Sequence, residues 1–434
     1  CIGFVRNPVC YNYFLSPHRY WFWRGKTMTQ AKNRITIDEN VEILKRYALL
    51  EKACMHTLAG WLPGVPEWDA KNELGLDVWE SADAANELYG RLRELRCYQP
   101  ERGVSEKLKA LVRELDYAQN TAELIATVYL VVKKSLLEAY RTHPDMTWSE
   151  FDNPTVKITE KLIPATERQV AWAEAFFPTI QQNYPGWEAW RDYIAGLLAA
   201  DSGVTGSEPV GQAVERPADG RELKLPWYEC QRMPDWPIFD PSVDFEPDRK
   251  TEPEAHRLWR FKHYLNEMTA AETLGSILWM TPEMPWEYQH NVSRHLWDEL
   301  RHSQLGQTRV QQLGLKIEDV PQVVQIYNVM MKLPAVEQYA LLTTVIEPNG
   351  MPEKVANREH WEEIEDEISA AAVSYDWSDE NFHVRWGKKW TPVLLETYKY
   401  PETPEQIATR MEAWLMENTP VRMQQKMAID AHKE

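Results

Sequence analysis

Two stretches, Asp298-Glu-Leu-Arg-His302 and Glu380-Asn-Phe-His383, are the most informative part of this chain of 434 residues. Each of them places a glutamate three residues before a histidine. On an α-helix, residues three apart lie on one face, so each stretch presents a carboxylate beside an imidazole. One such pair arises by chance in any acidic helical protein. Two pairs on separate helices predict a helical bundle with metal-ligating groups in its core.

Further glutamates stand at hairpin distance from these pairs. Antiparallel helices of ordinary length bring together residues roughly 30 positions apart, since each residue rises about 1.5 Å. Glu267 lies 32 residues before Glu299, and Glu347 lies 33 residues before Glu380, so both are expected to face the pairs. Glu272 lies 27 residues before Glu299. It is kept as the alternative on the first helix, or as an outer neighbour of the site.

The choice of Glu347 depends on how its helix ends. Pro348, Asn349 and Gly350 follow it, which predicts that the helix stops there. A separate helix over 353–374 is then expected before the last ligand helix. The rival is Glu337, 43 residues before Glu380, and the spacing favours Glu347.

The residue types indicate which metal would bind. Carboxylates neutralise and bridge two close cations, and imidazoles hold iron or manganese without the thiolates that select softer metals. The cofactor expected is two iron ions, two manganese ions or a mixed pair. The candidate ligands are Glu267, Glu272, Glu299, His302, Glu347, Glu380 and His383. A metal-free layer of hydrogen-bonded Glu and His is the alternative, but it would bury ionisable groups at high cost without a cation.

Four segments of the second half resemble the ferritin-like superfamily, closest to an uncharacterised bacterial branch related to the tRNA-hydroxylating monooxygenases. They are Asn266–Glu272, Asp298–His302, Val345–Gly350 and Glu380–Trp390. The resemblance covers roughly residues 255–398. It implies a four-helix bundle with a dinuclear metal site ligated by Glu267, Glu299, His302, Glu347, Glu380 and His383. Members of the superfamily carry out oxygenase, oxidase, ferroxidase and peroxidase chemistry, so the resemblance does not select a reaction.

The apolar spacing is helical almost throughout, which predicts an all-α fold. Helices are expected over 39–62, 68–97, 104–142, 153–199, 253–281, 285–313, 320–347, 353–374, 377–398 and 402–427. Pro, Gly, Asp and Trp are frequent between them in residues 201–252, which predicts a long irregular linker. The domains expected are a leader or extension (1–37), a first bundle (38–200), the linker, a second bundle (253–400) and a C-terminal helix (401–434).

The two halves share a pattern that favours a tandem duplication of one four-helix bundle. Trp61-Leu-Pro-Gly-Val-Pro66 parallels Trp279–Pro285, and each final proline stands 14 residues before Glu80 or Glu299. Gln169-Val-Ala-Trp likewise parallels His383-Val-Arg-Trp. Helical hairpins with proline-rich turns also converge on such spacing, so this alternative stays open.

The first half lacks the full ligand set. The equivalent places hold Arg46, Glu51, Glu80 with Asp83, Thr166 with Gln169, and Glu138. This predicts a degenerate bundle kept for packing. A single-metal site from Glu51, His56, Glu80 and Asp83 is the alternative, although His56 is expected to be a buried, hydrogen-bonded histidine. His295, one turn before Glu299, is expected at the surface, or else as an outer neighbour of the site.

Composition limits the classes of partner. The net charge of -18 argues against a nucleic-acid surface, and no apolar run reaches the roughly 18 residues that cross a bilayer. Five scattered cysteines without a C-x-x-C pair favour a cytoplasmic protein. The first 27 residues are aromatic and basic but lack the features of a secretory signal.

These observations predict a dinuclear iron or manganese oxidoreductase that activates dioxygen on a small organic substrate. No glycine-rich nucleotide fingerprint is present, so an external electron donor is expected. The alternatives are a ferroxidase-like metal-handling protein and a non-catalytic helical scaffold. No nucleic acid or membrane partner is expected, and a homodimer remains open.

Overall fold

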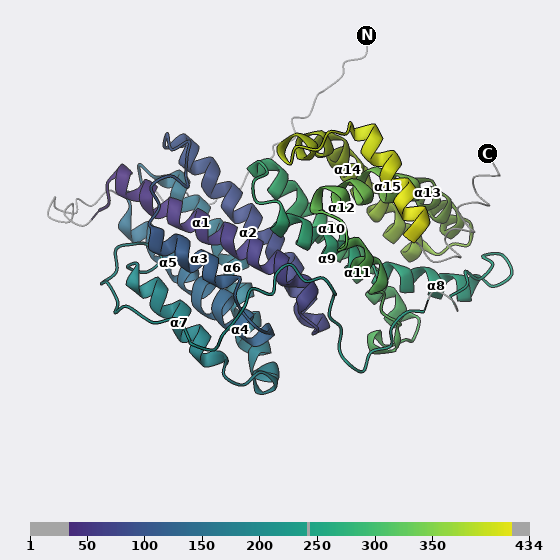
Figure 1. The fold of residues 1–434 in the computed structure, drawn as a ribbon, viewed down its shortest axis with the longest axis horizontal. Coiled ribbons are helices and arrows are strands. Elements are labelled where there is room, and N and C mark those ends of the chain that lie inside the picture. The colour runs from purple at the N-terminus through teal and green to yellow at the C-terminus, as the bar shows by residue number, and fades with distance from the viewer. Residues whose placement is uncertain (1–33, 241–243, 419–434) are drawn as a thin grey trace, which may run out of the picture.

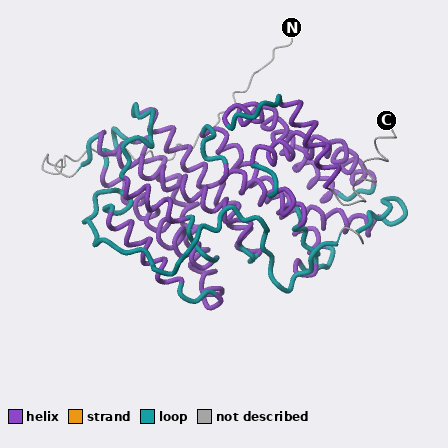
Figure 2. The backbone as a smooth tube through the Cα atoms, viewed as in Figure 1, coloured by secondary structure: helices purple, strands orange, loops and turns teal. Residues whose placement is uncertain are grey.

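The computed structural model describes residues 34–240 and 244–418 (Figure 1). Within these ranges the chain is helical, and the only β-pairing is one isolated bridge between Ile238 and Gln322 (Figure 2). The all-α prediction is therefore confirmed. None of the described helices combines the length and the apolar character that a membrane span requires. Most of the expected leader, and the end of the expected C-terminal helix, lie outside the described residues.

Helices α1–α7 form one half of the molecule (Figure 1). Their bounds are α1 Ile37–Trp61, α2 Trp68–Glu94, α3 Glu106–Leu115, α4 Thr121–Thr127, α5 Lys134–Met146, α6 Asn153–Ile180 and α7 Trp187–Ala200. Helix α1 begins with a capping box, because the Thr36 hydroxyl accepts from the Glu39 N–H while the Glu39 carboxylate accepts from the Thr36 N–H. The rigid Pro63-Gly64 turn then reverses the chain into α2.

Helices α8–α15 form the other half. Their bounds are α8 Pro253–Leu265, α9 Met268–Met280, α10 Trp286–Gln312, α11 Gln325–Met330, α12 Ala335–Leu341, α13 Glu347–Glu363, α14 Glu367–Thr397 and α15 Pro404–Asn418. The successive helices α8 and α9 pack along α10, and α13 packs along α14. Helix α10 also contacts α14, which closes this half into a helical bundle.

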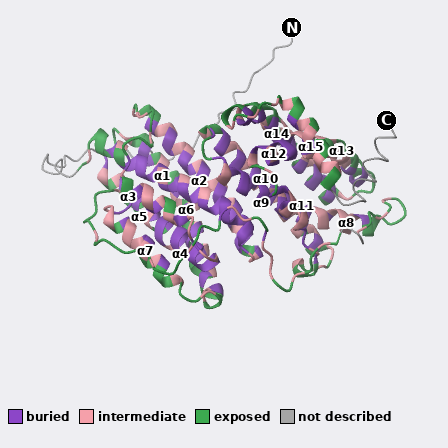
Figure 3. Ribbon diagram, in the orientation of Figure 1, coloured by how far each residue is buried: buried purple, intermediate pink, exposed green. Residues whose placement is uncertain are grey.

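One hydrophobic core runs through both halves (Figure 3). Helices α1 and α2 pack against α9 and α10, where glycines allow close approach. A Cβ on Gly275 would lie 2.5 Å from the Ala59 carbonyl oxygen, and one on Gly75 would lie 2.7 Å from the Leu300 side chain. In the described ranges, the two halves thus pack against each other around a shared core and are not separated by a free linker.

Residues 201–252 contain no helix in their described part. They form an irregular strap that packs on both halves (Figure 2). The Trp227 ring fills the space beside Gly64, and Arg221 pairs with Glu123 at 2.9 Å. Arg232 pairs with Glu272 at 2.6 Å in the second half. The strap therefore contributes contacts to each half as well as joining them.

Several expected helices are divided differently in the structure. Residues 104–142 form α3, α4 and α5, because Asn120 caps a new helix by accepting from the Glu123 N–H. Residues 153–199 break before Gly186, whose φ of +89° starts α7. The region 320–347 is likewise divided, into α11, α12 and the segment that leads to Glu347. The expected helices over 353–374 and 377–398 are instead α13 and one continuous α14, which Asp366 caps through the Ser369 N–H.

The expectation that Glu347 ends its helix is wrong. A π-helical segment, Leu342–Ile346, precedes it, and the Glu347 N–H donates to the Leu342 carbonyl. Helix α13 then continues through Pro348 and Gly350. A π turn shifts the hydrogen-bond register, so Pro348 stands at a new helix start, where its missing N–H costs little. A second π-helical segment, Val128–Lys133, joins α4 to α5 in the first half.

Candidate metal centre

Two helices carry the same stripe of donors. Helix α10 presents His295, Glu299 and His302, and helix α14 presents Asp376, Glu380 and His383. In each helix the three residues stand at i, i+4 and i+7, which places them on one face. Glu347 joins them from the start of α13. Glu267 joins them from the break between α8 and α9.

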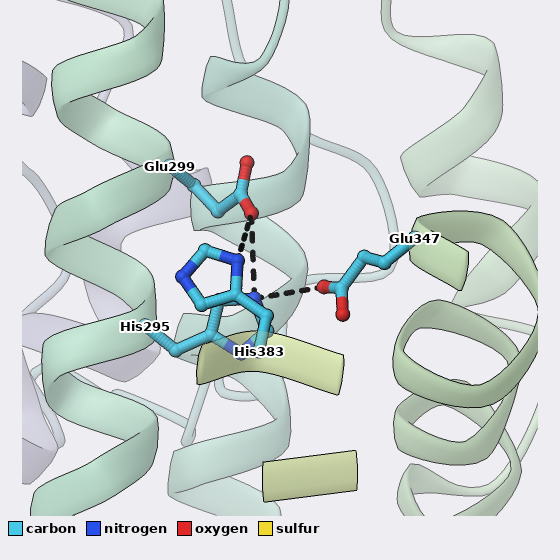
Figure 4. A group of neighbouring side chains, drawn as sticks. All are labelled: His295, Glu299, Glu347 and His383. Carbon is cyan, nitrogen blue, oxygen red and sulfur yellow. Dashed lines mark ion pairs between the residues drawn. The ribbon is translucent and has the colours of Figure 1, made fainter. Parts of the chain in front are cut away.

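The first group of donors, position 1, consists of His295, Glu299, Glu347 and His383 (Figure 4). The Nε2 atom of His295 lies 2.8 Å from Glu347 Oε1 and 3.3 Å from Glu299 Oε1. The Nδ1 atom of His383 also lies 3.3 Å from Glu299 Oε1. All four residues are buried, and the two imidazole rings stack with centroids 3.6 Å apart. A cation between these atoms would meet two nitrogens and two carboxylates.

The second position, position 2, is centred on His302, which belongs to two overlapping groups of donors: one with Glu267 and Glu299, and one with Asp376 and Glu380. The Nδ1 atom of His302 lies 3.4 Å from Glu267 Oε2 and 3.5 Å from Glu299 Oε2. The same nitrogen lies 3.4 Å from Asp376 Oδ1. Position 2 therefore has one imidazole and a larger share of carboxylates.

Glu299 belongs to both positions. Its Oε1 atom faces His295 and His383, while its Oε2 atom faces His302. This is the arrangement in which one carboxylate bridges two cations.

Orphaned polar atoms support a fit to metal ions. Among the described residues, the donor atoms that converge here are buried without a hydrogen bond: Glu267 Oε2, His295 Nε2, His302 Nδ1, both Glu347 oxygens, Glu380 Oε2 and His383 Nδ1. Buried polar groups normally have partners, and a metal ion would supply one to all of them.

Charge gives a second reason for the fit. The two positions contain five carboxylates and one ammonium, that of Lys354, which lies 2.6 Å from Asp376 and 3.1 Å from Glu380. With every carboxylate ionised and every histidine neutral, as metal ligation requires, these groups would carry four negative charges, which two divalent cations would neutralise. Uncompensated charge of this size in a protein interior is very unfavourable.

The pKa values of the glutamates also reflect how closely these charged groups are packed. Burial raises the pKa of Glu267 to about 8, and the Asp376 and Glu299 carboxylates add to the rise while Lys354 opposes it. Burial works against ionisation of Glu299 too, but the three imidazoles that face its carboxylate, those of His295, His302 and His383, hold its pKa well below the usual range. Glu299, which faces both positions, is thus held in its ionised form, in contrast to Glu267.

Two aspartates support the histidines from outside, each on the opposite helix. His383 Nε2 donates to Asp298 Oδ2 at 3.4 Å, and His302 Nε2 donates to Asp379 Oδ2 at 3.3 Å. Arg301 contacts both aspartates. Because the proton is held on Nε2, each histidine offers its Nδ1 lone pair to the centre.

Glu272 does not join the donors, in contrast to its place among the predicted ligands. Its carboxylate is fully buried and pairs with Lys71 Nζ and Arg232, each at 2.6 Å. The structure places Glu267 at the centre instead. The rival Glu337 pairs with Arg410 at 3.1 Å, away from the donors.

The first half has cations of its own where a metal would lie. Lys133 pairs with the buried Glu51 at 2.5 Å, and Arg168 pairs with Glu80 at 2.8 Å. His56 faces Gln289, and Asp83 faces Lys161 and His290. The structure does not bring Glu51, His56, Glu80 and Asp83 together, and no donor group is found in the described part of this half.

The other first-half residues that stand at places equivalent to second-half ligands form ion pairs or hydrogen bonds within the protein. Arg46 pairs with Asp201 at 2.8 Å, and the Thr166 hydroxyl donates to the Leu162 carbonyl. Gln169 donates to Glu80 at 2.8 Å. Glu138 is exposed and lies 4.0 Å from Arg141.

Several residues of the centre were not predicted from the sequence. His295 was expected at the surface and is fully buried, so that expectation is wrong. Asp376, Asp298, Asp379 and Lys354 were not identified at all. The signal for His295 and Asp376 was present as the shared i, i+4, i+7 stripe. The pairing of Asp298 and Asp379 with opposite histidines could only be seen in three dimensions.

Comparison with known proteins gives one result. Residues 226–416, less than half of the chain, match a family described as "Protein of unknown function (DUF455)". The matching stretch contains every donor of both positions. No curated protein and no solved structure matches the chain.

Proposed function

We propose that this chain is a dinuclear iron or manganese oxidoreductase of the ferritin-like type that activates dioxygen on a small organic substrate. The observation that carries the proposal is the placement of Glu299, whose two oxygens face two separate sets of buried histidine and carboxylate donors. This donor chemistry, with imidazole and carboxylate but no thiolate in the described groups, suits iron and manganese.

The residues of the centre would have distinct tasks. Bound metal ions would supply electrons for the reduction of dioxygen. Glu347 would help to hold an ion at position 1 and Glu267 an ion at position 2, and Glu299 would contribute to both positions. Asp298 and Asp379 hold the histidine protons on Nε2 and fix the ring orientations. The donors other than Glu267, whose side chain is 29% exposed, are buried, and this keeps bulk water away and strengthens the electrostatic contacts among them.

A cavity of about 680 Å³ between the halves is large enough for a small molecule, although none of the donors lines it. Its lining includes His56 and Asp116 from the first half and Trp279, Val336 and Tyr398 from the second. The volume is typical of small-ligand pockets. Val336 belongs to α12, which leads through the π-helical segment to Glu347. The electron donor would be external, and a cytoplasmic location is part of the proposal.

We also propose that the two halves arose by duplication of one four-helix bundle. Both contain a π-helical segment at the corresponding place, Val128–Lys133 and Leu342–Ile346. Lys133 stands 36 residues before Gln169, and Glu347 stands 36 residues before His383. In this alignment a lysine replaces a metal ligand, and its ammonium neutralises Glu51 where the second half would use a metal ion.

The test is the metal content of anaerobically purified and reconstituted protein. Wild type is expected to bind about two iron or manganese ions per chain, and the His302→Ala/His383→Ala variant is expected to lose them. The matched variant His263→Ala/His290→Ala removes two histidines outside the donor groups and should retain the metal. Loaded wild type should then consume dioxygen faster when its substrate and an electron donor are present.

Other outcomes would favour the other candidates. Dioxygen uptake that needs ferrous ion alone, with ferric product accumulating, would indicate a ferroxidase-like metal-handling protein. A wild-type protein that binds no stoichiometric metal after reconstitution would refute the enzyme proposal and leave a helical scaffold.

A further inference from the structure

The two metal positions differ in their donors, and this difference predicts which metal each one takes. The inference rests on the proposed function, since it requires that the centre binds two metal ions. It concerns which metal each position binds, which follows neither from the identity of the ligands alone nor from the family that residues 226–416 match.

Position 1 is rich in nitrogen. His295 Nε2 and His383 Nδ1 both face Glu299 Oε1, and Glu347 completes the group. The extra imidazole comes from His295, one turn before Glu299 on α10. In the described chain, Glu299 and Glu347 form ion pairs with histidines alone. A cation entering position 1 therefore meets no competing ammonium there.

Position 2 is rich in oxygen. His302 supplies its single imidazole, against the carboxylates of Glu267, Glu299, Asp376 and Glu380. Asp376 is the extra donor, one turn before Glu380 on α14. It is fully buried, and the Tyr264 hydroxyl donates to its Oδ2 atom at 2.7 Å. The ammonium group of Lys354 also lies against Asp376 and Glu380. A cation at position 2 would therefore be repelled by this positive charge.

Donor type and local charge act in the same direction. Sites of either kind bind iron(II) more tightly than manganese(II); nitrogen donors widen this preference, whereas carboxylate oxygens suit manganese(II) and narrow it. The nearby ammonium lowers the affinity of position 2 for any cation. We propose that position 1 fills first and selects iron, that position 2 fills second and accepts manganese, and that His295 and Asp376 set this difference.

Anaerobic competition tests the proposal without relying on turnover. Metal-free full-length protein is equilibrated with iron(II) and with a roughly tenfold higher free concentration of manganese(II), because carboxylate-rich sites also bind iron(II) somewhat more tightly. It is then separated from unbound metal and analysed for both elements. Wild type is expected to contain about one iron and about one manganese per chain. At substoichiometric total metal, the bound ion is expected to be mainly iron.

Two variants assign the difference to its residues. His295→Gln is expected to reduce bound iron severalfold while manganese at position 2 is retained. Asp376→Asn is expected to lose manganese and retain iron. His263→Gln and Asp235→Asn, which alter residues outside the donor groups, serve as matched controls and should show the wild-type composition.

Distinct results would overturn the inference. Two iron ions in wild type in the presence of this excess of manganese(II) would contradict the selection, and this measurement needs no variant to fold. A His295→Gln variant with the wild-type iron content would contradict the role of His295. An Asp376→Asn variant that loses iron and retains manganese would contradict the assignment of position 2. Two metals bound without discrimination would refute this inference alone, whereas no metal bound in any condition would refute the proposed function as well.

Discussion

At the scale of single residues, the outer aspartates decide how the histidines are presented. Asp298 accepts from His383 Nε2 and also pairs with Arg294 at 2.8 Å and with Arg301. Its charge is stabilised by these contacts, and the hydrogen bond to His383 helps to hold its pKa well below the usual range. A permanently ionised acceptor keeps the His383 proton on Nε2.

Replacement of Asp298 should therefore weaken metal binding without removing a ligand. Asp298→Ala is expected to lower metal affinity by about 10–100-fold, because the imidazole loses its orienting partner. Titration of metal-free protein with iron(II) under anaerobic conditions measures the change. Asp235→Ala, at an exposed aspartate, is the matched control. Wild-type affinity in Asp298→Ala would contradict the assigned role.

Lys354 acts as an internal counter-ion for the centre. Its ammonium lies 2.6 Å from Asp376, and the Asp376 and Glu380 carboxylates raise its pKa well above the usual range against the effect of burial. It therefore stays charged and stabilises the carboxylates around it, while it would oppose a metal ion at position 2.

Lys354→Met should separate these two effects. The metal-free variant is expected to lose roughly 3 kcal/mol of stability, because buried carboxylates lose their partner. Metal binding should become tighter, so the rise in unfolding temperature on adding manganese(II) should exceed that of wild type. Lys389→Met removes an exposed lysine that pairs with Glu287 and serves as the control. An equal metal-induced rise in variant and wild type would contradict the account of position 2.

At the scale of elements, the break between α8 and α9 sets the position of Glu267. Gly306 of α10 lies against the last turn of α8, where an added Cβ would lie 2.1 Å from the Leu265 backbone nitrogen. The Ser303 hydroxyl donates to the Leu265 carbonyl at 2.7 Å. Helix α10 thus holds the end of α8 directly before Glu267.

Gly306→Ala should disturb this contact. The variant is expected to lose about 1–3 kcal/mol of stability, since backbone and not a flexible side chain must move. Gly90→Ala in α2 is the matched control, because nothing lies within 4 Å of the Cβ that it adds. That control should gain roughly 0.5–1 kcal/mol from the lower entropy of its unfolded state. Denaturant unfolding measures both changes, and a Gly306→Ala variant as stable as wild type would refute the argument.

Elements also show where sequence reasoning succeeds. Helical periodicity predicted the hairpins and placed Glu299, His302, Glu380 and His383 on bundle-facing stripes, because spacing along one helix is a local property. It failed at Glu347, where a π-helical segment let the helix pass through Pro348. The π-helical turn adds one residue to the turn of the helix, and the spacing of the apolar residues in the sequence does not reveal it.

At the scale of the whole molecule, long-range partners explain the remaining errors. Glu272 has the spacing of a ligand, but Lys71 from the first half and Arg232 from the strap neutralise it at the junction of the halves. The burial of His295 likewise depends on Glu347 and His383, which come from other helices. No local pattern contains contacts between segments this far apart in the chain.

The pH dependence of stability also belongs to the whole molecule, and His143 is its clearest source. This histidine is fully buried in α5, its Nδ1 atom lies 3.4 Å from the Tyr47 hydroxyl, and its Nε2 atom has no hydrogen bond among the described residues. Burial lowers the pKa of His143 to about 4, although the Asp152 carboxylate opposes the change. The folded state therefore keeps the imidazole neutral at pH values where the unfolded state binds a proton.

This difference in proton binding decides whether the free energy of unfolding rises or falls with pH. Above pH 6.5 the imidazole is neutral in both states and costs nothing. As the pH falls from about 6.5 to about 4, the unfolded state alone gains a proton, so the free energy of unfolding should drop by about 3 kcal/mol from this residue. His143→Gln, which cannot titrate, should show a correspondingly smaller loss between pH 7 and pH 4 in denaturant unfolding of the metal-free protein. Parallel stability curves for variant and wild type would show that His143 is protonated in the folded state and that its burial does not control acid stability.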